Sequence, residues 1–101
     1  MDYKVYRINL EELFYIGCTE EPIEQYEFSE ARTKLGKALN REVEVHECRS
    51  NAKVLFANPD IHRAIEYEQK IATRFEDALP GLVVSDTISV VTKYANRKAK
   101  N

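Results

Sequence analysis

Two strand-like segments are separated by only three residues, and this short connection limits the possible folds more than any other feature. The segments Tyr3–Asn9 and Leu13–Cys18 are rich in tyrosine, valine and isoleucine, which favour strands. A three-residue connection is too short to cross over a sheet, so the two strands must pair antiparallel. The sequence therefore predicts a fold built around one hairpin.

A helix and a further strand are predicted after this hairpin. We expect the helix from Glu20 to about Asn40, with Thr19 as its cap and Pro22 in its first turn. Apolar residues recur there at helical spacing. Polar and apolar residues alternate along the segment Glu42–Arg49, which predicts a third strand. Residues 50–58 stay unassigned.

A second helix and a last strand complete the predicted domain. The helix begins near Asn58 or Asp60 and ends at Pro80-Gly81. Leu82–Val91 is β-like, with a break at Ser85-Asp86. The predicted order is β-β-α-β-α-β, an α+β domain with a small mixed sheet flanked by helices. We assign residues 1–92 to this domain and residues 93–101 to a basic tail.

Composition excludes several classes of protein. The 101 residues allow one domain, and the sequence has no apolar run of about 18 residues that would cross a membrane. No signal peptide is evident. Two cysteines are too few for a disulfide framework and form no zinc motif, so we expect a cytoplasmic protein with reduced thiols. The net charge of −2 does not indicate a nucleic-acid binder.

One carboxylate interrupts the apolar stripe of the second helix. Glu68 shares a helical face with Ala64, Ile65, Ile71 and Ala72. An unpaired buried carboxylate is costly, so this group must be paired, hydrated or functional. Two interpretations stay open: a glutamate at the stripe edge that reaches solvent or a basic partner, or a metal ligand that projects into a cleft.

Two tyrosines of the hairpin form a second candidate feature. Tyr6 and Tyr15 lie on adjacent strands and can be cross-strand neighbours. They are either packed against each other as aromatic residues or directed as phenols towards a substrate. The pattern alone does not separate the two interpretations.

Together these residues resemble the GIY-YIG nuclease family over roughly residues 3–86. The first motif corresponds to Lys4-Val5-Tyr6 and the second to Tyr15-Ile16-Gly17, and a glutamate-bearing helix follows. The resemblance implies phosphodiester hydrolysis around one Mg²⁺ or Mn²⁺. By this resemblance Tyr6, Tyr15 and Gly17 belong to the catalytic site, and Glu68 binds the metal.

The chain departs from the family pattern at three positions. Lys4 replaces the glycine of the first motif. Gln25 stands where the family has a helix arginine, and Val83 stands near the position of a late asparagine. Glutamine offers no fixed positive charge to a phosphoryl transition state. Arg32 lies two helical turns after Gln25 and is the candidate substitute.

Charge is unevenly distributed along the chain. Residues 1–30 contain eight acidic and two basic residues, whereas residues 93–101 contain four basic residues and no acidic one. The candidate partner-binding residues are Glu20, Glu21, Glu24, Glu27 and Glu30. The candidate nucleic-acid-binding residues are Lys93, Arg97, Lys98 and Lys100. The glutamates would repel nucleic acid, and their other interpretation is a solvated face that offsets the helix dipole.

Three functions are consistent with these patterns. The favoured hypothesis is a catalytically degenerate nuclease-like module that binds or inhibits a basic, nucleic-acid-handling protein. Its size fits a small regulatory protein, such as one from a phage or mobile element. The alternative is an active, divergent Mg²⁺-dependent endonuclease that cleaves DNA or RNA. The third is non-catalytic nucleic-acid binding through the tail and the tyrosines.

Overall fold

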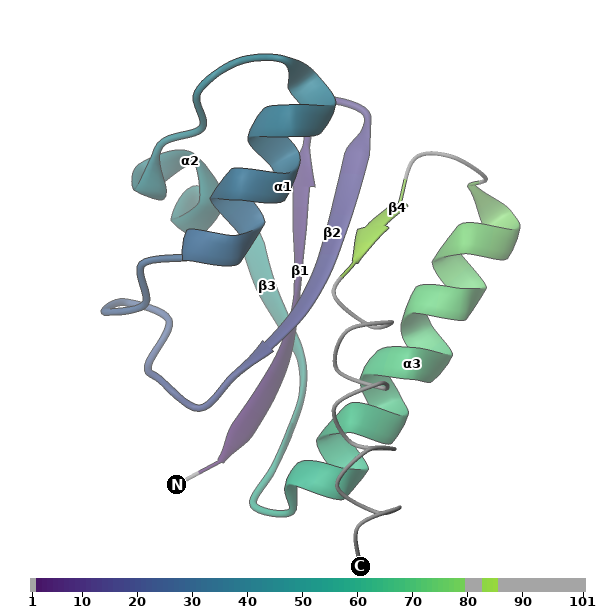
Figure 1. Ribbon diagram of the computed structural model, residues 1–101. Helices are drawn as coiled ribbons and strands as arrows, with labels where there is room; N and C mark the ends of the chain where they lie inside the picture. Colours follow the sequence, from purple (N-terminus) through teal and green to yellow (C-terminus); the bar gives the residue numbers. More distant parts are fainter. Residues whose placement is uncertain (1, 80–82, 86–101) are drawn as a thin grey trace, which may run out of the picture.

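The predicted hairpin is present and lies at the centre of the sheet. The computed structural model describes residues 2–79 and the backbone of residues 83–85, with β1 at Tyr3–Leu10 and β2 at Leu13–Thr19. These strands pair antiparallel, with Leu10 opposite Leu13 (Figure 1). The loop therefore contains only Glu11 and Glu12, and Glu11 adopts a left-handed φ of 56°. Positive φ values are typical of two-residue hairpin loops.

Two further strands flank the hairpin. β3, Ala52–Asn58, pairs antiparallel with β1, and β4, Val83–Ser85, pairs parallel with β2. The strand order is β3-β1-β2-β4. The α+β class predicted from the sequence is thus confirmed, and one parallel pair makes the sheet mixed.

The first helix begins nine residues later than predicted. α1 covers Ser29–Leu39. The predicted start at Glu20 is wrong because the backbone N–H groups of Gln25 and Tyr26 donate to the Pro22 carbonyl in a turn. Phe28 then takes a left-handed φ of 54°, which a helix cannot contain, and its side chain is fully buried. The cost of this backbone conformation is offset by placing a large ring in the core.

The predicted third strand, Glu42–Arg49, is also wrong. Most of it forms a short helix, α2, at Val45–Ser50, and β3 follows in the segment that the sequence pattern left unassigned. A capping box explains the difference: Glu44 accepts from the backbone of Glu47, and Glu47 accepts from the backbone N–H of Glu44. This local hydrogen bonding outweighs the alternation of residues 42–49. The order becomes β-β-α-α-β-α-β.

The second predicted helix agrees best with the sequence. α3 covers Ile61–Ala78 and is capped by Asp60, which accepts a hydrogen bond of 2.9 Å from the backbone of His62. Pro59 precedes the cap and therefore lies outside the first turn. Of the described helices, α3 included, none has the length and apolar character of a membrane span.

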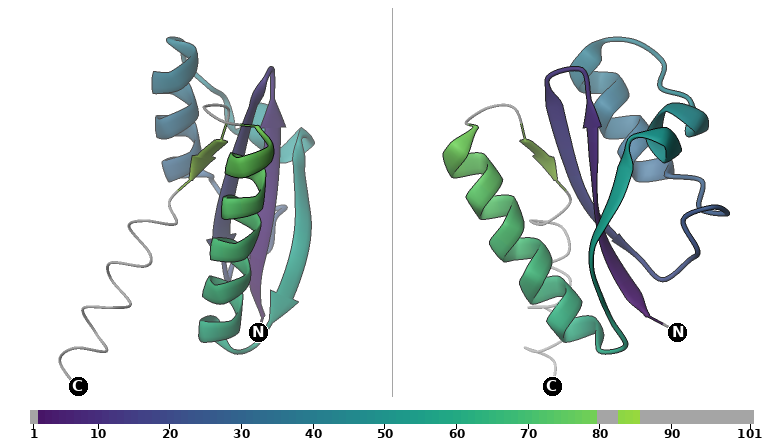
Figure 2. Two further views of the ribbon diagram at one scale, coloured as in Figure 1. Left: turned by 90° about the vertical axis from the view of Figure 1, so that its right-hand side faces the viewer. Right: turned by 180° about the vertical axis from the view of Figure 1, so that it is seen from behind.

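The helices cover opposite faces of the sheet (Figures 1 and 2). One core cluster lies under α1 and α2 and includes Tyr6, Ile8 and Tyr15 from the hairpin. The other lies under α3 and includes Val5 and Ile16. Because successive side chains of a strand point to opposite faces, the hairpin supplies both clusters. The predicted strand beyond residue 85 and the basic tail lie outside the described residues.

The capping box predicts an acid-dependent loss of stability. Arg41 donates hydrogen bonds to Glu47 at 3.0 and 3.2 Å and lowers the pKa of Glu47 below its usual value of 4.5. A lowered pKa stabilises the fold above the pKa of the unfolded chain, and this contribution is lost as the pH falls through the folded pKa. We expect Glu47→Gln to lower the melting temperature by a few degrees at neutral pH, and we expect this deficit to shrink as the pH falls below about 4.

Thermal unfolding followed by circular dichroism across this pH range tests the prediction. Glu42→Gln is the matched control because Glu42 is exposed nearby and lies outside the capping box. If the melting temperature of Glu47→Gln were lower than that of the wild type by the same amount at both ends of the pH range, the role of this carboxylate would be contradicted.

Candidate functional site

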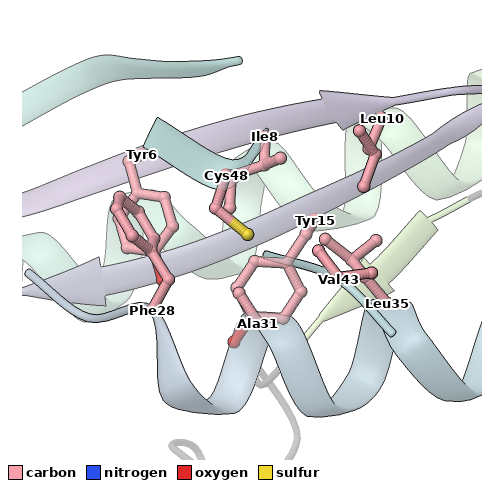
Figure 3. Packing of buried hydrophobic residues seen from close by; sticks show 9 residues of the cluster. All are labelled: Tyr6, Ile8, Leu10, Tyr15, Phe28, Ala31, Leu35, Val43 and Cys48. Atoms are coloured by element: carbon pink, nitrogen blue, oxygen red, sulfur yellow. The ribbon is translucent and has the colours of Figure 1, made fainter. Parts of the chain in front are cut away.

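The two motif tyrosines are core residues. Tyr6 and Tyr15 are each 1% exposed, and their ring centroids lie 6.1 Å apart. Tyr6 also meets Phe28 edge-on at 5.5 Å. Figure 3 shows both tyrosine rings between the hairpin and α1, close to Phe28 and Ala31. This arrangement corresponds to the first of the two interpretations, in which the tyrosines pack against each other as aromatic residues. α1 separates both rings from solvent.

Gly17 allows this aromatic packing. It lies opposite Tyr6 in the hairpin, and a Cβ atom at Gly17 would be 2.6 Å from the Tyr6 Oη and 2.8 Å from a ring carbon of Tyr15. Such contacts are shorter than any that real side chains tolerate. The glycine of the second motif is therefore required here by the close approach of a buried ring.

Glu68 lies on the other side of the sheet from the tyrosines. It is 1% exposed and belongs to the buried stripe of α3, between Ala64 and Ala72. The negative charge of Glu68 acts on the thiol of Cys18 on β2. The structure therefore does not bring Glu68 together with Tyr6 and Tyr15, whose cluster lies under α1.

The surroundings of Glu68 do not fit a magnesium ion. Magnesium in proteins keeps several of its water molecules, whereas this carboxylate is almost fully enclosed beside alanines. Burial, with the Glu68 charge as a second cause, raises the pKa of the Cys18 thiol to about 11, so this neighbour is a protonated thiol at neutral pH. Among residues 2–79, no group of three or more His, Cys, Asp or Glu residues is suited to hold a metal.

Arg32 has a structural partner in the segment between α1 and α2. Its Nε donates a hydrogen bond of 2.9 Å to the carbonyl of Val43, which ties α1 to the segment before α2. It also lines a shallow pocket of about 340 Å³ with Ser29, Thr33 and Arg41. Neither motif tyrosine nor Glu68 is among the residues that line this pocket.

Residues 20–30, which contain the candidate partner-binding glutamates, are held to the core, and these glutamates are exposed. Four of its five glutamates precede α1, and only Glu30 lies in the first turn of that helix, so a balance with the helix dipole applies to Glu30 alone. Arg49 of α2 donates to the carbonyls of Ile23 and Tyr26 at 3.3 and 3.0 Å. Tyr26 packs against Phe28 at 4.7 Å. We call residues 20–30 the acidic segment below.

The sequence analysis missed a second charged surface. Arg63, Tyr67 and Lys70 of α3 line a pocket of about 270 Å³ with Phe56 of β3. Their spacing of four and three residues places them on one face of the helix, and this spacing was visible in the sequence. Phe56 was not identifiable because β3 itself was not predicted. Lys93, Arg97, Lys98 and Lys100 lie outside the described residues.

The close approach at Gly17 predicts a size-dependent loss of stability. Gly17→Ala forces a methyl group against the Tyr6 ring, so we expect it to destabilise the protein by about 1–3 kcal/mol. In a Tyr6→Leu background the same substitution meets a smaller side chain and should cost less. Urea unfolding of the wild type, both single variants and the double variant measures this coupling. Fully additive effects would contradict the proposed contact.

The environment of Cys18 predicts slow alkylation. A rise in the pKa from 9.0 to about 11 reduces the thiolate fraction about a hundredfold at mildly alkaline pH. In a Cys48→Ser variant, we expect iodoacetamide to react about a hundredfold more slowly with the folded protein than with the urea-unfolded protein. Glu68→Gln should increase the alkylation rate of the folded protein, because it removes the Glu68 charge, which is the second cause of the raised pKa of Cys18. Equal rates for folded and unfolded protein would disprove this description of the site.

Comparisons with known proteins give no assignment. No family model, no curated protein and no solved structure matches the chain. The likeness to GIY-YIG nucleases is therefore carried by the motif residues in the sequence.

Proposed function

We propose that the chain is a GIY-YIG-like domain that functions as a binding module without efficient nuclease activity. The observation that carries this proposal is the placement of the motif residues. Tyr6 and Tyr15 are 1% exposed under α1, whereas Glu68 lies under α3. A phosphodiester that reached the two tyrosines would not reach Glu68, because the sheet lies between them.

The position of the candidate arginine supports the same conclusion. Gln25 is exposed in the turn before α1 and carries no charge. Arg32 donates to the Val43 carbonyl in the segment between α1 and α2. A catalytic cation must lie within hydrogen-bond distance of the charge that develops during the reaction. The pocket that Arg32 lines does not include Glu68.

The acidic segment is the proposed binding surface. Its members, which are exposed on one continuous stretch of chain, are Glu20, Glu21, Glu24, Glu27 and Glu30. Because Arg49 holds the carbonyls of Ile23 and Tyr26, little conformational entropy is lost when a partner binds. A fixed row of carboxylates is complementary to the basic face of a nucleic-acid-handling protein.

A titration with a defined basic peptide tests the binding role. We expect a lysine- and arginine-rich peptide to shift the NMR amide signals of residues 20–30, with an affinity that falls as salt is added. The double variant Glu24→Gln/Glu27→Gln should weaken this binding about tenfold. Glu12→Gln/Glu66→Gln is the matched control because both glutamates are exposed outside the acidic segment. Equal weakening by the two double variants would contradict a specific acidic surface.

A nuclease assay tests the alternative function. Supercoiled plasmid and structured RNA are incubated with the wild type and with Glu68→Ala in Mg²⁺ or Mn²⁺. We expect no cleavage above background from either protein. Cleavage by the wild type that disappears in Glu68→Ala would overturn the proposal and establish an active, divergent endonuclease.

A further inference from the structure

One edge of the sheet is not paired with another strand in the described part of the chain. β3 is the terminal strand on its side, so the backbone groups along its outer edge have no strand partner there. This strand also carries Val54, which is 41% exposed and is the one large apolar residue exposed among the described residues. An exposed edge with an apolar side chain is a site at which an extended peptide can add a strand.

The two sides of this edge differ in chemistry. Val54 lies opposite Tyr6 and therefore faces the α1 side of the sheet. Phe56 lies opposite Val5, and Lys53 lies opposite Arg7. Because Val5 packs under α3 and side chains alternate along β1, both Phe56 and Lys53 lie on the α3 side.

The α3 side of the edge is basic. Arg63, Tyr67 and Lys70 follow one another at intervals of four and three residues, which places them in one row along the helix. The row faces β3, because the Tyr67 ring stacks on Phe56 at 4.5 Å with an angle of 9° between the rings. Arg63 and Lys70 line the pocket beside these rings, and its one acidic member is Glu66. With Lys53 of β3, this row forms what we call the basic edge.

We propose that the basic edge binds an extended acidic peptide segment of a partner protein as an additional strand. The peptide backbone pairs with β3 through main-chain hydrogen bonds. Its side chains then alternate between two environments. Those on the α3 side meet Lys53, Arg63 and Lys70 and are therefore aspartate or glutamate, whereas those on the α1 side lie beside Val54 and are apolar. The recognised pattern is an alternation of acidic and apolar residues.

The geometry favours a peptide over the two other possible occupants of the basic edge, which are nucleic acid and a second copy of this chain. Nucleic acid needs an open aromatic face for base stacking, but one face of the half-buried Tyr67 ring is covered by Phe56. It also makes no use of a free backbone edge. Edge-to-edge pairing of two copies of this chain would bring two basic edges together, and an edge lysine such as Lys53 opposes such pairing. The basic edge does not include the acidic segment, so this inference is independent of the proposed function.

A designed peptide tests the inference on the full chain. The probe is a labelled nine-residue peptide that alternates valine with glutamate, and binding is followed by fluorescence anisotropy. We expect saturable binding that weakens with salt and slower hydrogen exchange at the β3 amides when the peptide is present. A probe of the same composition with its acidic residues gathered at one end, and a probe with a central proline, should both bind at least about tenfold more weakly.

Matched variants locate the binding site. Arg63→Glu/Lys70→Glu should weaken binding of the alternating probe about tenfold. Lys34→Glu/Lys37→Glu, which changes the same charge on α1, should leave it unchanged. Equal weakening by the two variants would overturn the proposal because it would indicate only a general charge effect.

Two further results would replace the proposed occupant. Tighter binding of a ten-residue oligothymidine than of the peptide, lost in Arg63→Glu/Lys70→Glu, would assign the basic edge to nucleic acid. A dimer seen by light scattering that disappears in Val54→Asp would assign the edge to a second copy of the chain. Either result would show that the acidic-peptide proposal is wrong.

Discussion

The close contact of the Tyr6 ring with Gly17 is the interaction on which the rest of the structure depends. β1 and β2 lie next to each other, and a buried ring can cross from one to the other only where the facing residue has no side chain. With Tyr6 in this position, Tyr15 and Phe28 pack around it and α1 is fixed over this face. The left-handed backbone of Phe28 follows from the same packing, and it determines where α1 begins.

The two-sided core has a direct consequence for function. The tyrosines that resemble a nuclease motif stabilise the face under α1, whereas Glu68 lies among the residues under α3. Side chains that would have to act together are thus divided by a sheet. The resemblance in sequence is consistent with packing alone, because the tyrosines and Gly17 are needed for the core whether or not catalysis occurs.

The described surface carries charges of opposite sign in two separate places. Carboxylates gather on the acidic segment before α1, which Arg49 holds in place through backbone carbonyls. Cations gather along α3 beside the terminal strand β3. Under the two proposals one small domain would distinguish a basic protein surface from an acidic extended chain, because each surface repels the partner proposed for the other.

The sequence by itself determined the hairpin, the α+β class and α3, because each depends on local signals: a very short connection, strict helical spacing and a capping aspartate. It also identified Glu68 as a member of the buried stripe of α3. Only the tertiary structure decided the start of α1, the helical form of residues 45–50 and the position of β3. In these segments local alternation and charge suggested one conformation, but the burial of Phe28 and the capping contacts of Glu44 and Glu47 favoured another. The grouping of the candidate site residues was likewise a tertiary outcome, because no sequence pattern specifies which face of a sheet a helix will cover.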